Sequence, residues 1–329
     1  MKVSRPLDAV LSWDLWRLRK HLNAITAHSC DTAWFVPSPA GHSKKVTLVS
    51  HIDTVFDDRR RLPRIFRDRE KMVYWSPDGL GADDRAGVYS ILKIFDSMPD
   101  EYKPNLLFCD GEEHGCWGAM DAADEFETFL KDTLFFIELD RRGSNDCVFY
   151  NNEPKPFRYL ISSYGFKEEW GTYSDISCLG EKLSKCAANL SIGYYGEHTT
   201  SEYLVVEEME RTIGRVIEIV RAATKAGVSW PNKQAKRSAW GGGGWRDTIH
   251  YGRADATRFN YWESVKDKPE HTYTVAPDDD DEPIPVDEFM DPGAMSTKIS
   301  RKERKRIRRL KERGLITDDR VRDPFYHSW

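Results

Sequence analysis

The chain has 329 residues, of which 40% are apolar, and it carries a formal net charge of −5 with a calculated isoelectric point of about 6.0. This balance gives no sign of a nucleic-acid partner, and no apolar run of about 18 residues predicts a membrane span. The start of the chain lacks the apolar core of a signal peptide. Six cysteines without C-x-x-C spacing favour reduced thiols over a disulfide framework or a thiolate zinc site. We therefore expect a soluble, cytoplasmic protein.

Helical and extended patterns alternate along residues 1–227. In chain order they predict a helix over 7–22, strands over 32–36, 46–51 and 72–75, a loop and helix over 79–95, a strand over 105–109, a helix over 119–130, a strand over 133–139, an edge strand over 147–150, a helix over 157–164 and a strand over 189–195. Thr199 and Glu202 match a T-x-x-E capping box for a long last helix, which Gly227 would end. This alternation predicts an α/β fold with an open mixed, mainly parallel sheet flanked by helices.

Residues 228–329 have a different composition and are predicted to be a low-complexity, partly disordered extension. They contain WGGGGW at 240–245, an acidic run at 278–282 and a basic segment at 299–313, and little of this can bury a core. The basic segment is the one candidate for contact with nucleic acid or an acidic partner, although a solvated charge run is the simpler interpretation. Elsewhere in the extension, tryptophans at 230, 240, 245 and 262 indicate that part of it packs on the domain or on a partner.

The strand expected over 46–51 runs directly into polar residues. Its apolar and β-branched residues are typical of a buried strand, and His51 and Asp53 then follow two residues apart. Side chains two apart on an extended backbone point to the same face. Imidazole is a common zinc ligand whose second nitrogen is usually held by an acceptor, a role that Asp53 can fill. An isolated H-x-D would more simply be a surface pair, so the rest of the chain decides.

Other acidic and imidazole residues occur where strands end or helices begin. They are Asp83 and Asp84 at the junction of the loop and helix expected over 79–95, Glu112 and Glu113 after the strand at 105–109, Asp140 after the strand at 133–139, and His198 after the strand at 189–195. In isolation, the two aspartates would simply cap a helix. Because the carboxyl ends of parallel strands meet at one edge of a sheet, the whole set indicates a shared site there.

The order and local contexts of these residues resemble the co-catalytic di-zinc exopeptidases. The contexts are H-x-D-T-V at 51–55, G-A-D-D-R-A-G at 81–87, E-E-x-G at 112–115, L-D at 139–140 and H-T-T-x-E-Y at 198–203. That superfamily includes peptidase T, single-domain leucyl aminopeptidases, and acylase and glutamate-carboxypeptidase relatives. The resemblance covers about residues 45–220.

The resemblance implies two bound metal ions, zinc or another divalent metal such as Co²⁺ or Mn²⁺. The implied ligands are His51 and Asp140 on one metal, Glu113 and His198 on the other, and Asp83, rather than Asp84, bridging both. Asp53 would orient His51, and Glu112 would be the general base for the water that the metals share. Nitrogen and oxygen ligands without thiolates suit such a catalytic site.

Two further features bear on the branch of the superfamily. GTYSD at 171–175 resembles the tyrosine-containing loop before the last ligand in lid-less aminopeptidases, so Tyr173 is the implied candidate for oxyanion stabilisation.

Many members of the acylase and peptidase T branch insert a dimer-forming lid domain between the fourth and fifth ligands, but residues 141–197 leave no room for one. We therefore expect single-domain aminopeptidase architecture, although the 51–55 and 81–87 motifs look more like peptidase T.

These residues predict a zinc-dependent peptidase that uses a metal-bridging water, first of all an aminopeptidase acting on free amino termini. The enzyme alternative is a carboxypeptidase or an N-acyl amino acid amidohydrolase with the same metals, since Arg85 and Arg141 near the expected ligands could bind a carboxylate. A catalytically inactive peptidase-fold binding module ranks third, because no expected ligand is missing. The expected partner is a peptide or acyl-amino-acid substrate, and no membrane is expected.

Overall fold

The structure is a computed structural model that describes residues 2–56, 62–150 and 153–230. Within these ranges the main sheet has eight strands, in the spatial order β1-β2-β6-β3-β7-β10-β8-β9. Their bounds are β1 (His28–Ser29), β2 (Ala33–Val36), β6 (Asn105–Cys109), β3 (Thr47–His51), β7 (Phe136–Arg141), β10 (Ala187–Ser191), β8 (Asp146–Val148) and β9 (Lys167–Glu168). The central strands β6, β3, β7 and β10 run parallel, whereas β2 is antiparallel to β1 and β6, and β8 is antiparallel to β10 but parallel to β9. The predicted mixed, mainly parallel sheet is confirmed.

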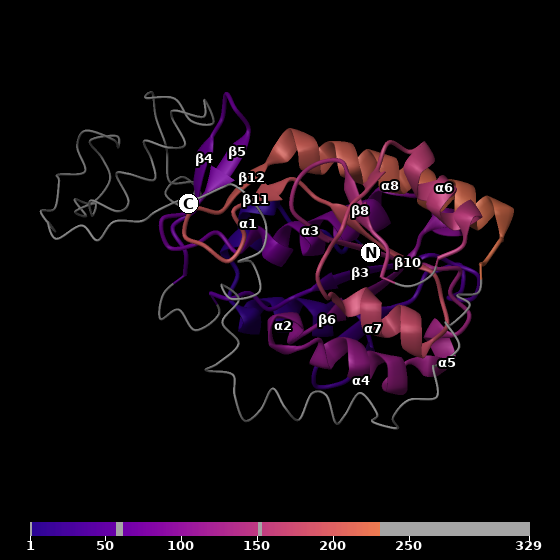
Figure 1. The fold of residues 1–329 in the computed structure, drawn as a ribbon. Coiled ribbons are helices and arrows are strands. Elements are labelled where there is room, and N and C mark those ends of the chain that lie inside the picture. Colours follow the sequence, from indigo (N-terminus) through magenta and orange to yellow (C-terminus); the bar gives the residue numbers. More distant parts are fainter. Residues whose placement is uncertain (1, 57–61, 151–152, 231–329) are drawn as a thin grey trace, which may run out of the picture.

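Apolar side chains alternate between two cores along the central strands. Leu48 and Leu106 lie in the core on one face, whereas Val49 and Leu107, the next residues, lie in the core on the other. The helices of the first core are α1 (Leu7–Ser12), α2 (Leu15–Ile25), α3 (Ala82–Ser97), α6 (Lys155–Ser163) and α8 (Val206–Ala226), and those of the second are α4 (Trp117–Glu125), α5 (Glu127–Leu130) and α7 (Asp175–Lys182) (Figure 1). Parallel strands covered on both faces can be continuously apolar, so their polar residues gather at the strand ends.

A smaller antiparallel sheet stands beside the main one (Figure 1). It contains β11 (Tyr194–Tyr195), β12 (Tyr203–Val205), β5 (Val73–Trp75) and β4 (Phe66–Asp68), in that order. The loop between β11 and β12 carries His198. None of the helices in the described ranges is long and apolar enough to cross a membrane.

Three predicted elements are divided in the structure. The helix expected over 7–22 is α1 and α2, the helix over 119–130 is α4 and α5, and the strand over 189–195 is β10 and β11. Asp14 interrupts the first, because its carboxylate caps α2 by accepting the N–H of Arg17 at 2.7 Å. Gly193 interrupts the last: at φ +92° the chain turns out of the main sheet, and a Cβ there would lie 2.9 Å from Met209 N.

The predicted capping box of Thr199 and Glu202 is wrong, because α8 begins only after β12. The Glu202 carboxylate is buried and accepts the backbone N–H groups of Gly81 and Asp83, at 2.5 and 2.9 Å. These N–H groups at the start of α3 have no partner within their own helix, so a distant carboxylate satisfies them. Gly227 ends α8 as predicted, at φ +62°.

The predicted glycine-rich, acidic and basic segments of the extension lie outside the described residues. Its first part is described, and Trp230 packs on the domain with its ring centroid 6.1 Å from that of Phe135 and 5.8 Å from that of Phe157. The Trp230 carbonyl accepts the thiol of Cys186 at 3.1 Å. Phe135 and Cys186 directly precede β7 and β10, so Trp230 lies at the amino ends of the parallel strands, opposite the edge where the polar residues gather.

The close approach of α4 to β6 depends on Gly118. A Cβ there would lie 2.5 Å from both Asp110 N and Thr32 O. We predict that Gly118→Ala lowers the free energy of unfolding by about 1–3 kcal/mol, the cost of overpacking, as measured by urea titration. The control Gly214→Ala, at an exposed position of α8 with nothing within 4 Å, should instead raise it by about 0.5–1 kcal/mol because alanine favours the helix. Equal effects of the two substitutions would contradict the packing.

Candidate metal centre

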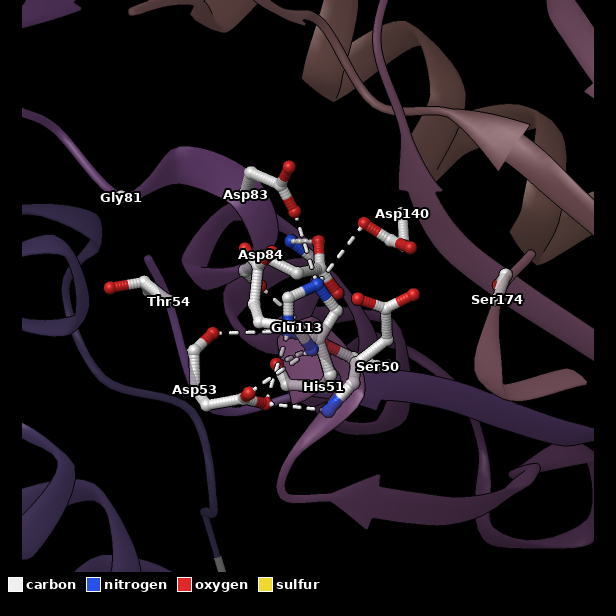
Figure 2. Close-up of polar contacts among 12 residues, drawn as sticks. Ser50, His51, Asp53, Thr54, Gly81, Asp83, Asp84, Glu113, Asp140 and Ser174 are labelled. Carbon is white, nitrogen blue, oxygen red and sulfur yellow. Dashed lines mark hydrogen bonds and ion pairs between the residues drawn. The ribbon is translucent and has the colours of Figure 1, made fainter. Parts of the chain in front are cut away.

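Four of the implied ligands, His51, Asp83, Glu113 and Asp140, meet at the carboxyl edge of the main sheet (Figure 2). The fifth, His198, contacts Asp83 and Glu113 there. His51 ends β3, Asp140 lies near the end of β7, Asp83 begins α3, Glu113 lies in a 3₁₀ turn (Glu112–His114) after β6, and His198 lies between β11 and β12. The parallel register of β6, β3 and β7 brings three of these segments to one edge. Four are nearly buried, and the His198 side chain is half exposed.

The carboxylate of Asp83 is divided between two histidines. Its Oδ1 lies 3.0 Å from His51 Nε2, and its Oδ2 lies 3.1 Å from His198 Nε2. Asp140 Oδ1 lies 3.3 Å from the same nitrogen of His51, and Glu113 Oε2 lies 3.1 Å from that of His198. The geometry therefore places Asp83 between two pairs of side chains, His51 with Asp140 and His198 with Glu113, which gives two candidate subsites that share Asp83.

The chemistry of this cluster fits divalent cations. Donor atoms of His51, Asp83 and Glu113 all lie within 4.8 Å of one another. Glu113 Oε1 is buried, and no hydrogen-bond partner for it is found in the described part of the chain. A buried carboxylate oxygen without a partner is costly, and a metal ion at this position would satisfy it. Imidazole and carboxylate donors suit zinc, cobalt or manganese.

The acidic residues create a strongly negative site. Contacts with Asp83 and Glu113 raise the pKa of His198 to about 11. Burial alone would lower the pKa of His51, but the carboxylates of Asp140, Asp53 and Asp83 raise it well above its usual range. A site that stabilises protons so strongly on two imidazoles also stabilises metal cations in their place.

Asp84 also lies close enough to His51 and Asp140 to form a group of potential ligands. Its carboxylate already has other partners, because Oδ2 accepts the Ser50 hydroxyl at 2.5 Å and Oδ1 accepts the Gly87 N–H at 3.0 Å. Burial raises its pKa well above the usual range. These contacts make Asp84 a structural residue of the α3 terminus and leave Asp83 as the bridging candidate.

Asp53 contacts both His51 and the glutamate pair. His51 Nδ1 lies 3.0 Å from the Asp53 carbonyl oxygen and 3.4 Å from Asp53 Oδ1. The Asp53 carboxylate also accepts the backbone N–H groups of Glu112, at 3.1 Å, and Glu113, at 3.3 Å. One carboxylate thus orients the imidazole and fixes the turn that carries the implied base and one implied ligand.

Glu112 lies near the cluster, because the charges of His51 and Asp140 act on its carboxyl group. Burial raises the pKa of Glu112 well above its usual range; the charge of His51 opposes this and that of Asp140 adds to it. A raised pKa suits a carboxyl group that takes up and returns a proton near neutral pH. The other implied catalytic residue, Tyr173, has its hydroxyl 2.9 Å from Cys178 Sγ, and its role in oxyanion stabilisation stays a prediction.

Three residues that support the ligands were not predicted from the sequence. Tyr194 donates its hydroxyl to Asp140 Oδ1 at 3.1 Å, and the Asn189 side chain pairs with the Asp140 backbone at 2.9 and 3.0 Å. The third, Glu202, holds the N–H of Asp83. Glu202 belongs to the H-T-T-x-E-Y motif at 198–203. Its place in that motif, close to His198, was the sequence signal that could have marked it as part of the site and not as a helix cap.

The sheet and the helices on both its faces form a zinc-exopeptidase-like fold. Residues 36–175 match the model of peptidase family M28, so this part of the chain is similar to the hydrolases of that family. This match confirms the resemblance to the co-catalytic exopeptidases, and a peptidase family implies a peptide as the class of substrate. The cluster around Asp83 is the candidate for a co-catalytic metal site of the kind that family has.

Solved structures agree in fold. A tripeptidase from Staphylococcus aureus is 13% identical, with a TM-score of 0.50, over 67% of this chain and 97% of its own. The aminopeptidase PepT from Bacillus cereus is 15% identical, with a TM-score of 0.50, over 66% of this chain and 96% of its own. A comparison with curated proteins gave no match. At such low identities, the solved structures establish the fold alone.

Glu202 offers a test of how the bridging carboxylate is held. We predict that Glu202→Gln weakens zinc binding about 10-fold to 100-fold, the usual effect of losing a group that orients a ligand, because an amide cannot accept both N–H groups equally. Competition with a chelating dye measures this, and circular dichroism checks the fold. The matched control is Glu207→Gln, at an exposed position in the first turn of α8. Unchanged zinc affinity in Glu202→Gln would show that this contact does not position Asp83.

Proposed function

We propose that this domain is a zinc-dependent aminopeptidase that removes residues from peptides with a free amino terminus. The observation that carries the proposal is the division of the Asp83 carboxylate between the subsite of His51 and that of His198. A shared carboxylate is what two neighbouring metal ions require. Bound there, divalent metals would acidify a shared water and stabilise the negative charge that develops on the scissile carbonyl oxygen.

The protein side chains divide the remaining tasks. Glu112 takes the proton of the attacking water and returns it to the leaving amine, which its raised pKa favours. Asp53 keeps Glu112 in position by accepting its backbone N–H. The Glu113 carboxylate lies 3.1 Å from His198 Nε2, so the two adjacent glutamates serve different purposes.

The placement of the arginines supports recognition of the amino end of the substrate. Two arginines were considered above as groups that could bind a substrate carboxylate. Arg85 is only 2% exposed within α3, and the Arg141 guanidinium donates to the carbonyl of Trp170 at 3.1 Å. This arrangement favours an aminopeptidase over a carboxypeptidase.

We further propose a cytoplasmic location and zinc as the resident metal. All six cysteines are free thiols, which suits a reducing compartment. Zinc is proposed because the cluster offers imidazole and carboxylate donors in two adjoining subsites. Cobalt and manganese accept the same donors, so metal analysis of the protein purified from its own cells tests this part.

The proposed reaction is tested with a short peptide library and zinc-loaded protein. Half of the peptides are blocked at the amino terminus, and half are amidated at the carboxyl terminus. We expect mass spectrometry to show stepwise loss of residues only from free amino termini. Glu112→Gln should lower kcat about 10²-fold to 10⁴-fold, because it removes the general base, while the zinc content stays unchanged. The matched control is Glu125→Gln, at an exposed position of α4, which should keep full activity.

The other outcomes identify the alternatives. Trimming only from free carboxyl termini would make the protein a carboxypeptidase. Cleavage of N-acyl amino acids but not of peptides would make it an amidohydrolase. Full activity of Glu112→Gln would contradict the assigned base whichever substrate is cleaved.

A further inference from the structure

A pair of cysteines lies beside Glu112, apart from the ligands. Cys116 directly precedes α4, and Cys178 lies in α7; these two helices pack against each other on the same face of the sheet. Both cysteines are buried, and their thiols interact directly. Cys116 Sγ also lies 4.0 Å from Glu112 Oε1. The thiol pair therefore adjoins the proposed general base.

The two thiols have different chemistry. The hydrogen bond from Cys116 lowers the pKa of Cys178 to about 7; burial opposes this, and hydrogen bonds from Tyr173 and Ser177 add to it. Burial raises the pKa of Cys116. A thiolate on Cys178 thus has three hydrogen-bond donors around it. Its neighbour Tyr173 is 39% exposed, so Cys178 lies just below the surface. A low-pKa thiol beside a second cysteine is the arrangement found in redox-sensitive sites.

Other buried cysteines in the structure lack this arrangement. Burial raises the pKa of Cys109, Cys147 and Cys186, which makes them unreactive. Cys30 is half-buried, with its sulfur 3.9 Å from the hydroxyl of Thr32. It therefore serves as a control for thiol oxidation in general.

We propose that Cys116 and Cys178 form a reversible disulfide that lowers the activity of the enzyme. In its effect on activity, this inference rests on the proposed peptidase function.

The oxidant is a peroxide. The Cys178 thiolate attacks one peroxide oxygen, the O–O bond breaks, and hydroxide leaves, so Cys178 becomes a sulfenic acid. Cys116 gives its proton to that hydroxide and attacks the Cys178 sulfur; the S–O bond breaks and a second hydroxide leaves. Two electrons pass from the two thiols to the peroxide.

The position of Cys116 explains why this bond affects catalysis. The backbone N–H of Cys116 donates to the Glu112 carbonyl at 3.3 Å, at the end of the turn that carries Glu112 and Glu113. Bonding of its sulfur to Cys178 draws Cys116 toward α7 and changes the contact of that sulfur with the Glu112 carboxyl. We expect kcat to fall about 100-fold, as when a catalytic group moves by about 1 Å.

The test treats the full zinc-loaded protein with hydrogen peroxide, alkylates the remaining thiols and maps the peptides by mass spectrometry. We expect a peptide pair joined through Cys116 and Cys178, the loss of peptidase activity given above, and recovery of both thiols and activity after reduction with a phosphine. Cys178→Ser should form no such link and should keep its own untreated activity after peroxide. The matched control Cys30→Ser should behave as the wild type does.

Two results would overturn the proposal. One is recovery of Cys116 and Cys178 as separate alkylated thiols, or as separate higher oxides, after peroxide treatment. The other is formation of the linked pair with no change in the activity of an active preparation. The peptide map reports the disulfide even in a protein without peptidase activity. A failure of the proposed function can therefore be distinguished from a failure to form the disulfide.

Discussion

The Asp83 carboxylate connects parts of the protein that are distant in sequence. One oxygen lies 3.0 Å from the imidazole of His51 at the end of β3, and the other lies 3.1 Å from that of His198 beside the small sheet. The backbone N–H of Asp83 is held in turn by the buried Glu202, four residues after His198 in the chain. Main sheet, α3 and small sheet therefore meet at one side chain, and two cation subsites follow from its two oxygens.

The close fit between α3 and β7 fixes this side chain opposite Asp140. A Cβ on Gly87 would lie 2.4 Å from the carbonyl oxygen of Leu139 and 2.3 Å from both carboxylate oxygens of Asp84, so only glycine allows the helix to approach. Asp84 fills the space beneath the helix terminus, where Ser50 donates to it. The neighbouring aspartates thus have different tasks: one supports the backbone, and the other faces the site.

The main sheet and the positions of the polar residues at its edge could be predicted because both depend on local sequence, whereas the ligand roles come from the family resemblance and stay predictions. A change from apolar to polar residues marks the end of a strand, and His51 and Glu113 lie at or just after such changes. The supporting contacts depend on tertiary packing. Glu202 matched a helix cap in sequence and instead satisfies N–H groups more than a hundred residues away, and no local pattern links Tyr194 to Asp140. The alternation of helix and strand likewise could not show that residues 189–195 divide between two sheets at Gly193.

The central claim is that Asp83 bridges two metal ions, and anomalous X-ray scattering at the zinc edge from crystals of the full chain grown with zinc tests it most directly. The account predicts two anomalous peaks about 3.5–4 Å apart, with the Asp83 carboxylate between them, His51 and Asp140 on one and Glu113 and His198 on the other. A single peak, or a pair of peaks to which Asp83 contributes no oxygen, would contradict it.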